Sequence, residues 1–321
     1  LFILGVTQYA VLVSAYPLVR RFVAIQHVMV SYISSMGFLL FALLLSIYPC
    51  VYRNVFWVYS FDNLTRGTNF IEFNFSFALD SLSLWFAILV TTIGLATNCY
   101  TKSYFRGEAD EGNFLFWLNA FILSMLVLVL AGNFFTVFVG WELIGLTSFF
   151  LINFWRTRRG VVKSSFKALV FNVVSDCLLL GSFVCFYLVY STTNCKTFLS
   201  IVITTATPRT TLLWFGTLCL ISCAAIKSVQ MIGHLWLPDS MEAPVPASSL
   251  IHSATLVSAG IYLLCRFNVL LVVTDCISPL ITLGSITAAY GGVVAAAQTD
   301  MKKLLAYSTM SHCGFLWILA S

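Results

Sequence analysis

The stretch WFGTLCLISCAAIKSVQMIGHLWLPDS, residues 214–240, decides how the rest of the chain is interpreted. Its first half is an apolar run of the kind that forms a membrane-spanning helix, which needs about 20 mostly apolar residues. One cation, Lys227, stands inside this run, and Ser228, Gln230 and Gly233 follow it closely. Polar residues and irregular backbone are tolerated at membrane depth only inside protein or beside water. We therefore predict a membrane helix that breaks or lines water near Lys227.

The whole chain has the composition of a membrane protein. Of its 321 residues, 60% are hydrophobic and 9% are charged, and the mean hydropathy is +0.95. These charges are too few to solvate the surface of a soluble protein. We expect an all-α, polytopic transmembrane helix bundle with about ten spans. The apolar runs cover residues 1–17, 28–49, 78–101, 113–131, 133–155, 164–190, 211–231, 245–267, 277–298 and 303–320.

The connections between these runs carry most of the basic residues. Connections after odd-numbered runs hold about twice as many Lys and Arg as those after even-numbered runs, which predicts that the odd ones face the matrix or cytoplasm. Residues 60–74, in an even connection, fit either a loop or a short hairpin. The net charge of +5 is spread over single residues and pairs, so we expect no binding of nucleic acid.

Sequence motifs for cofactors are missing. The ten cysteines include no C-x-x-C pair, and no glycine-rich phosphate-binding loop occurs. We predict that the cysteines are small buried hydrophobic residues and that this chain binds no metal, nucleotide or other cofactor. The first residues lack the pattern of a secretory signal, so we expect no removable signal peptide.

Three charged residues stand out inside predicted spans: Glu142, Asp176 and Lys227. An unpaired charge at a helix centre costs about 2.5–3.5 kcal/mol on insertion scales, so we expect these groups to be paired or hydrated. If the Glu142 carboxylate approaches the Lys227 ammonium to about 4 Å, their attraction is about 4 kcal/mol at an effective dielectric constant near 20. Such a pair is a switch if the carboxylate can move or be neutralised, and static if it cannot; the residues leave both open.

Two histidines follow the buried lysine. His234 comes seven residues after Lys227, a spacing that would place both on one helix face. His252 lies in SLIHSATLVSAG, among hydroxyl-bearing and apolar residues. A single buried histidine is usually a hydrogen-bonded core residue, but beside a lysine and a carboxylate it can carry protons. We include both as candidate functional residues.

Three stretches carry a resemblance to a known family. They are GWELIGLTSFFLINFW (140–155), KSVQMIGHLWLPDSMEAPVPASSLIHSATLVSAGIYLL (227–264) and TDMKKLLAYSTMSHCGF (299–315). They resemble the chain 5 family of antiporter-like subunits in mitochondrial NADH:ubiquinone oxidoreductase, respiratory complex I. The large subunit of the multisubunit sodium/proton antiporter of bacteria shares the first two motifs. The resemblance extends from about residue 73 onward.

The resemblance implies an antiporter-like fold in three parts. Residues 1–110 would hold helices one to three, and residues 111–270 one complete repeat of helices four to eight with a half-channel. Residues 271–321 would start the inverted copy with helices nine and ten. Family members continue with a buried lysine on helix twelve and a lateral helix. We expect a second chain to supply that part, from a split gene, unless this sequence is a fragment.

The resemblance also implies roles for single residues. Glu142, Asp176, Lys227 and His252 match the family's functional positions on helices five, six, seven and eight. One departure is Val173, where the family usually has an arginine that could pair with the helix-six aspartate. The full candidate set for proton translocation is Glu142, Asp176, Lys227, His234, His252, Lys302 and Lys303.

The implied function is proton translocation through a Glu/Lys/His relay, driven by quinone reduction elsewhere in complex I. The chain would be a subunit of a proton-translocating NADH:ubiquinone reductase without active-site chemistry of its own; flavin, iron–sulfur clusters and ubiquinone would belong to other subunits. Expected partners are the other membrane-arm subunits, including antiporter-like subunit 4, and phospholipids of the mitochondrial inner membrane. Alternatives are a subunit of a sodium/proton antiporter and a structural membrane subunit without an active channel.

Overall fold

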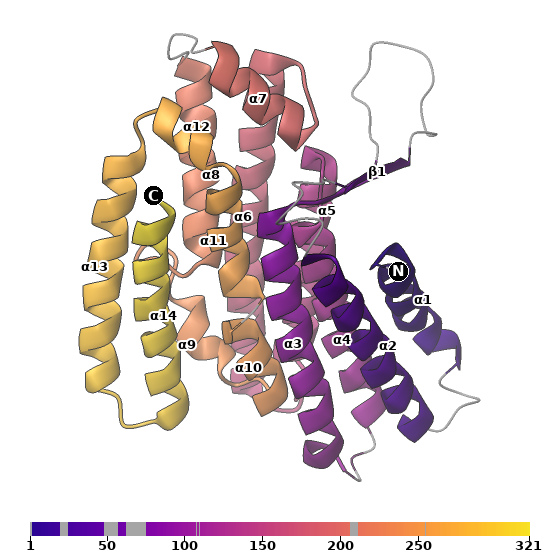
Figure 1. The fold of residues 1–321 in the computed structure, drawn as a ribbon. Coiled ribbons are helices and arrows are strands. Elements are labelled where there is room, and N and C mark those ends of the chain that lie inside the picture. The colour runs from indigo at the N-terminus through magenta and orange to yellow at the C-terminus, as the bar shows by residue number, and fades with distance from the viewer. Residues whose placement is uncertain are drawn as a thin grey trace.

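A computed structural model describes residues 2–19, 25–47, 57–61, 75–106, 108, 110–205, 211–253 and 255–321. They form a bundle of helices, which confirms the predicted helical membrane fold (Figure 1). The helices are α1 (Phe2–Val19), α2 (Ile25–Leu45), α3 (Ser81–Tyr104), α4 (Glu111–Val129), α5 (Phe134–Ile152), α6 (Arg159–Tyr190), α7 (Cys195–Thr205), α8 (Thr211–Lys227), α9 (Trp236–Ser240), α10 (Val245–Ser253), α11 (Leu256–Arg266), α12 (Asn268–Val273), α13 (Ile277–Ala296) and α14 (Met301–Ala320).

Each of the ten predicted apolar runs coincides with described helix. Within the described residues, seven segments are long and apolar enough to cross a membrane, with α10 and α11 taken together as one. Three of the ten predicted runs, which form α1, α8 and α14, are not among these seven candidate spans. For α8 the reason is its length, because 17 residues extend only about 26 Å and the hydrocarbon core is about 30 Å thick.

A short hairpin precedes α3. Strand β1 (Trp57–Phe61) pairs with β2 (Phe75–Leu79) in antiparallel register, with Trp57 opposite Leu79. Residues 60 and 61 belong to β1, and residues 62–74 lie outside the described part of the chain, so the choice between a loop and a hairpin within residues 60–74 stays a prediction. β2 also joins the α4–α5 turn, where the Gly132 amide donates to the Ser76 carbonyl at 2.8 Å.

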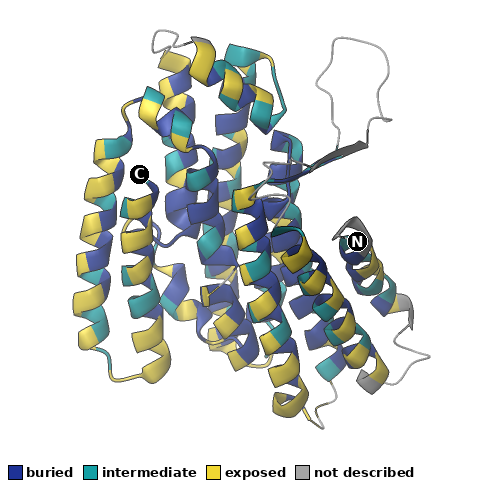
Figure 2. Cartoon of the chain, in the orientation of Figure 1, coloured by how far each residue is buried: buried dark blue, intermediate teal, exposed yellow. Residues whose placement is uncertain are grey.

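The core lies between α3, α4, α5, α6, α8 and α11, whose inward faces are buried while the outward faces are exposed (Figure 2). Helices approach closely where a glycine removes the side chain. A Cβ on Gly140 of α5 would lie 2.7 Å from the Leu128 backbone nitrogen of α4. Outward apolar faces and small residues at the crossings are typical of helices that pack in a bilayer.

Two helices break inside the bundle. The helix that contains the first predicted break, α8, ends at Lys227, and Val229 adopts a positive φ of 60°. This confirms the break predicted near the lysine. The run 245–267 was expected to be one span, and Val245–Arg266 is one candidate span whose helix is divided into α10 and α11. At this second break the Thr255 hydroxyl donates to the Leu250 carbonyl at 2.9 Å, which satisfies an acceptor that the interrupted helix leaves free.

The break after α8 is packed against α11. A Cβ on Gly260 of α11 would lie 2.6 Å from the Ala224 carbonyl oxygen of α8 and 3.0 Å from Ser228. Only glycine lets the backbones come this close, so α11 supports the end of α8 directly. The pair α13 and α14 packs along one side of the bundle (Figure 1). The division into parts at residues 1–110, 111–270 and 271–321 stays a prediction.

Candidate functional site

Lys227 is fully buried at the carboxyl end of α8. Its Nζ donates a hydrogen bond of 2.6 Å to the Trp141 carbonyl oxygen and lies 4.4 Å from the centroid of the Trp141 ring. The Asp176 carboxylate is 3.5 Å from the same nitrogen. A carbonyl, an aromatic face and a carboxylate are the groups that stabilise a buried ammonium. The negative end of the α8 dipole adds to this stabilisation.

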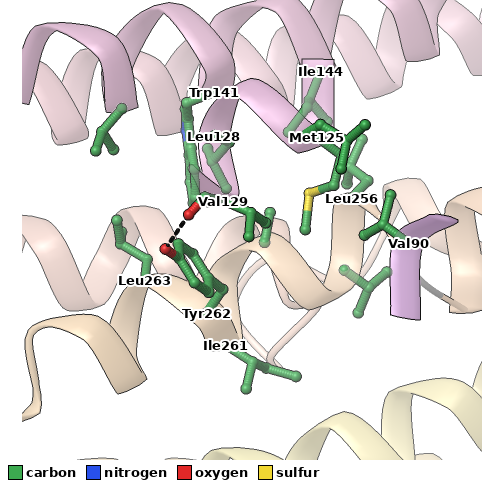
Figure 3. Close-up of a cluster of buried hydrophobic side chains, with 14 of the residues drawn as sticks. Val90, Met125, Leu128, Val129, Trp141, Ile144, Leu256, Ile261, Tyr262 and Leu263 are labelled. Atoms are coloured by element: carbon green, nitrogen blue, oxygen red, sulfur yellow. Dashed lines mark hydrogen bonds between the residues drawn. The ribbon is translucent and has the colours of Figure 1, made fainter. Parts of the chain in front are cut away.

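Three helices are tied together around this ammonium. The Trp141 indole N–H of α5 donates to the Ser175 hydroxyl of α6 at 3.2 Å, and that hydroxyl donates to the Cys223 carbonyl of α8 at 3.1 Å. Ser175 precedes Asp176, so the same turn of α6 holds the ring and supplies the carboxylate. Trp141 also borders the buried apolar cluster of Figure 3, where Tyr262 donates to the Val129 carbonyl at 2.6 Å. Trp141 therefore connects the lysine group to the apolar core of the bundle.

The close contact between Glu142 and Lys227 considered from the sequence does not form in the described part of the chain. Glu142 is exposed, and the carboxylate next to the ammonium belongs to Asp176. Successive residues of a helix point about 100° apart. Because the lysine binds the carbonyl and ring of Trp141, the next side chain along α5 points away. Glu142 acts on Lys227 and Asp176 only through longer-range Coulomb forces.

The two candidate histidines lie beyond the break. Because α8 ends at Lys227, the prediction that His234 shares a helix face with this lysine is wrong. The His234 Nδ1 lies 2.7 Å from the Met231 carbonyl oxygen, and its ring packs edge-on against Tyr290 at 5.3 Å. No ion pair joins it to a carboxylate among the described residues.

His252 is 8% exposed on α10. Its Nε2 lies 3.4 Å from the Ser240 hydroxyl oxygen. Its Nδ1 has no hydrogen-bond partner among the residues that the structure describes. A buried ring nitrogen of this kind is costly without a partner, and the site is polar enough for a bridging water. His252 therefore remains a candidate proton carrier between the two helix breaks.

Lys302 and Lys303 lie at the start of α14 and are exposed. Lys302 donates to the Met241 carbonyl at 3.3 Å, and Lys303 pairs with Asp300 at 3.4 Å. Among the described residues, neither forms a hydrogen bond or ion pair with Lys227 or Asp176. The structure thus brings Lys227 and Asp176 together and places the other candidates around them or at the bundle's end.

A second group of ion pairs was not predicted from the sequence. Asp80, at the start of α3, lies 2.7 Å from the Lys196 ammonium of α7 and 3.3 Å from the Arg266 guanidinium of α11. Arg266 also donates to the Tyr262 hydroxyl at 3.0 Å and to the Ala131 carbonyl at 3.1 Å. The signal was present, because all three charged residues belong to even-numbered connections or their edges and were expected on the same side of the membrane.

The described residues offer few ligands for a metal ion. Within the searched residues of the described chain, no group of three His, Cys, Asp or Glu side chains could hold a metal ion. The lysine group instead offers one cation, one carboxylate and hydroxyls at a helix break. Groups of this kind can hold, release and accept protons.

Comparison with known proteins places the chain in a family. Residues 131–321 match the family model described as NADH:quinone oxidoreductase/Mrp antiporter, TM, and residues 64–115 match NADH-Ubiquinone oxidoreductase (complex I), chain 5 N-terminus. NADH-ubiquinone oxidoreductase chain 5 of Paramecium tetraurelia is 47% identical over 255 residues, which are 77% of this chain and 45% of that protein. The chain 5 protein of Chondrus crispus is 38% identical over 262 residues, 79% of this chain and 39% of that protein.

A solved structure shares the fold. The Mrp complex from Dietzia sp. DQ12-45-1b superimposes with a TM-score of 0.86 and 29% identity, covering 99% of this chain and 34% of that chain. The chain therefore spans less than half the length of these relatives. From the family match over more than half of its residues, from the shared chain 5 relatives and from the broken-helix bundle, it follows that this multi-pass membrane chain belongs to the NADH:quinone oxidoreductase/Mrp antiporter family.

Proposed function

We propose that this chain forms part of the proton-translocating membrane arm of a complex I type NADH:ubiquinone oxidoreductase. The observation that carries the proposal is the fully buried Lys227 ammonium, held by Asp176 and Trp141 where α8 breaks. Intramembrane ionisable residues that face the bundle interior are typical of proton and ion pathways. Broken helices that meet at the middle of the membrane are typical of transporters.

The energies suit a proton pump. At 3.5 Å and an effective dielectric constant near 20, the Lys227–Asp176 attraction is about 5 kcal/mol. Moving one charge across about 150 mV costs about 3.5 kcal/mol. Closing or opening this one contact can therefore balance the transfer of one proton against the membrane potential. Asp176 is suited to respond, because its side chain is 16% exposed while that of Lys227 is fully buried.

The proposed role of the Lys227–Asp176 pair does not require the arginine that the family usually has at position 173. Val173 occupies its position and is 51% exposed on the outward side of α6. Asp176 points to Lys227 instead, so it has a cationic partner without the arginine. We propose a relay in which Asp176 controls the charge of Lys227 and His252 passes protons onward through Ser240 and water.

Neighbouring subunits are part of the proposal. Glu142 lies near the middle of α5, a candidate span, and is exposed. A carboxylate facing lipid at that depth is costly, so another protein surface in the membrane arm would cover it. By analogy with its relatives, the assembly would include antiporter-like subunits and the remaining part of chain 5. It would lie with phospholipids in the mitochondrial inner membrane and hold flavin, iron–sulfur clusters and quinone in other subunits.

Replacement of the lysine tests the function. We expect Lys227→Ala to abolish NADH-driven proton pumping in sealed vesicles, because no other buried ammonium is held at this break in the described chain. The matched control is Lys163→Ala, an exposed lysine near the start of α6, which should pump normally. Assembly is checked by the amount of intact complex in native gels. Normal pumping in assembled Lys227→Ala complex would refute the proposal.

The Dietzia likeness supports a second candidate, sodium/proton antiport. The two functions differ in what the purified assembly contains. Flavin and iron–sulfur absorbance in the assembly would support complex I, and sodium-dependent proton uptake without these chromophores would support antiport. A structural role without transport would instead predict that neither activity changes in Lys227→Ala.

A further inference from the structure

A cavity at one end of α4 and α5 is separate from the lysine group. It has a volume of about 570 Å³, within the range of about 300–1,000 Å³ found for small-molecule sites. Its walls come from the start of α4 and from the residues that follow α5, and both helices are candidate spans. The cavity therefore lies at the ends of predicted membrane helices, where these helices meet water.

Aromatic rings form the walls of this cavity. Trp117 stacks on Phe150 with ring centroids 4.0 Å apart, and Phe154 packs edge-on against Trp155 at 5.1 Å. The buried Phe105 packs next to Trp155, with ring centroids 6.3 Å apart and ring planes inclined by 26°. The rings that line the cavity are therefore packed against other rings of the bundle. Aromatic faces attract cations, and cages of this type recognise quaternary ammonium groups.

One charge of each sign completes the lining. Asp110 and Arg156 both line the cavity and are exposed. The Asp110 carboxylate accepts a hydrogen bond of 3.2 Å from Asn113, which orients it. Neither charged group has an ion-pair partner within 4 Å in the described part of the chain. The cavity thus offers a carboxylate with aromatic faces for a cation and a guanidinium for an anion.

We propose that this cavity binds the phosphocholine headgroup of a phosphatidylcholine molecule, with the trimethylammonium against Trp155 and Trp117 near Asp110 and the phosphate on Arg156. A zwitterion matches the two opposite charges, whereas a purely anionic headgroup would face the aspartate. A quaternary ammonium has no N–H donors to satisfy, so aromatic walls suit it better than a strongly hydrated primary ammonium. The acyl chains would remain in the bilayer beside α4 and α5.

Headgroup selectivity is the direct test. The full chain in its native membrane assembly is labelled with a phosphatidylcholine that carries a photoreactive diazirine on one acyl chain, and crosslinks to the segments around Trp117 and Trp155 are quantified. Unlabelled phosphatidylcholine, phosphatidylethanolamine with identical acyl chains, and soluble phosphocholine then compete. We expect phosphatidylcholine to compete about threefold to thirtyfold better than phosphatidylethanolamine, the range that a cation–π contact contributes.

Two variants locate the effect. Trp155→Leu should remove the preference for choline over ethanolamine, while Trp85→Leu, an exposed tryptophan on α3, should keep it. Arg156→Gln, an exposed change that leaves the fold intact, should weaken competition by both lipids about twofold to fivefold and leave their ratio unchanged. Arg106→Gln, exposed near the end of α3, is its control.

Three results would overturn the proposal. The first is equal competition by the two lipids in the unaltered chain. The second is an unchanged choline preference in folded Trp155→Leu, or unchanged competition in Arg156→Gln. The third is displacement by soluble phosphocholine without displacement by phosphatidylcholine, which would assign the cavity to a soluble ligand instead of a lipid.

Discussion

Replacement of Asp176 by asparagine tests the central ion pair. The change keeps the shape of the side chain and removes the charge that lies 3.5 Å from the fully buried Lys227 ammonium. Their attraction is about 5 kcal/mol at an effective dielectric constant near 20, and removal of one partner from a buried pair usually costs about 3–5 kcal/mol. We expect Asp176→Asn to lower the free energy of unfolding by about 3 kcal/mol or more. Glu142→Gln should lower it by less than about 1 kcal/mol.

Equilibrium unfolding of the detergent-purified chain in mixed micelles measures both changes, without neighbouring subunits that could pair with Glu142. A double-mutant cycle isolates the contact. Lys227→Met combined with Asp176→Asn should cost less than the sum of the two single changes, because no uncompensated charge is then left inside the bundle. The reasoning is refuted if Glu142→Gln destabilises as much as Asp176→Asn, or if the two changes at the pair are strictly additive.

Three further changes probe the supports of the site. Gly260→Ala should destabilise the chain by about 1–3 kcal/mol in the same unfolding assay, because the new Cβ would lie 2.6 Å from a backbone carbonyl of α8. Its control is Gly181→Ala, where the new methyl group would meet open space; this change should be neutral or stabilise the chain by up to about 1 kcal/mol. Trp141→Phe should cost about 1–2 kcal/mol by loss of the indole hydrogen bond to α6, and equal stability would show that this bond does not hold the ring. Arg266→Gln should lower the free energy of unfolding by about 3 kcal/mol, since its guanidinium is buried against carbonyl, hydroxyl and carboxylate oxygens. Its control, the exposed Lys303→Gln, should change this free energy by less than about 1 kcal/mol. Similar values for the two variants would contradict the role of the buried guanidinium.

The helical membrane fold could be predicted because its causes are local. A run of apolar residues must form a helix in lipid, since every backbone group there needs an internal hydrogen bond. The predicted runs therefore coincide with described helices. The break after Lys227 was predictable for the same reason, because the polar residues that follow it cannot face lipid. The break between α10 and α11 was not predicted, although His252, Ser253 and Thr255 interrupt the apolar run there.

The partners of buried charges could be predicted only in kind. The amino-acid sequence by itself determined that Glu142, Asp176 and Lys227 lie within predicted spans and that Lys227 needs a carboxylate, because the cost of burying a charge depends on the residue and its depth. Which carboxylate lies beside the lysine was decided by tertiary structure alone. The rotation of α5 presents the carbonyl and ring of Trp141 to the ammonium and turns Glu142 outward, while α6 supplies Asp176. Helix rotation depends on packing across the whole bundle, and residue spacing along one helix does not contain it.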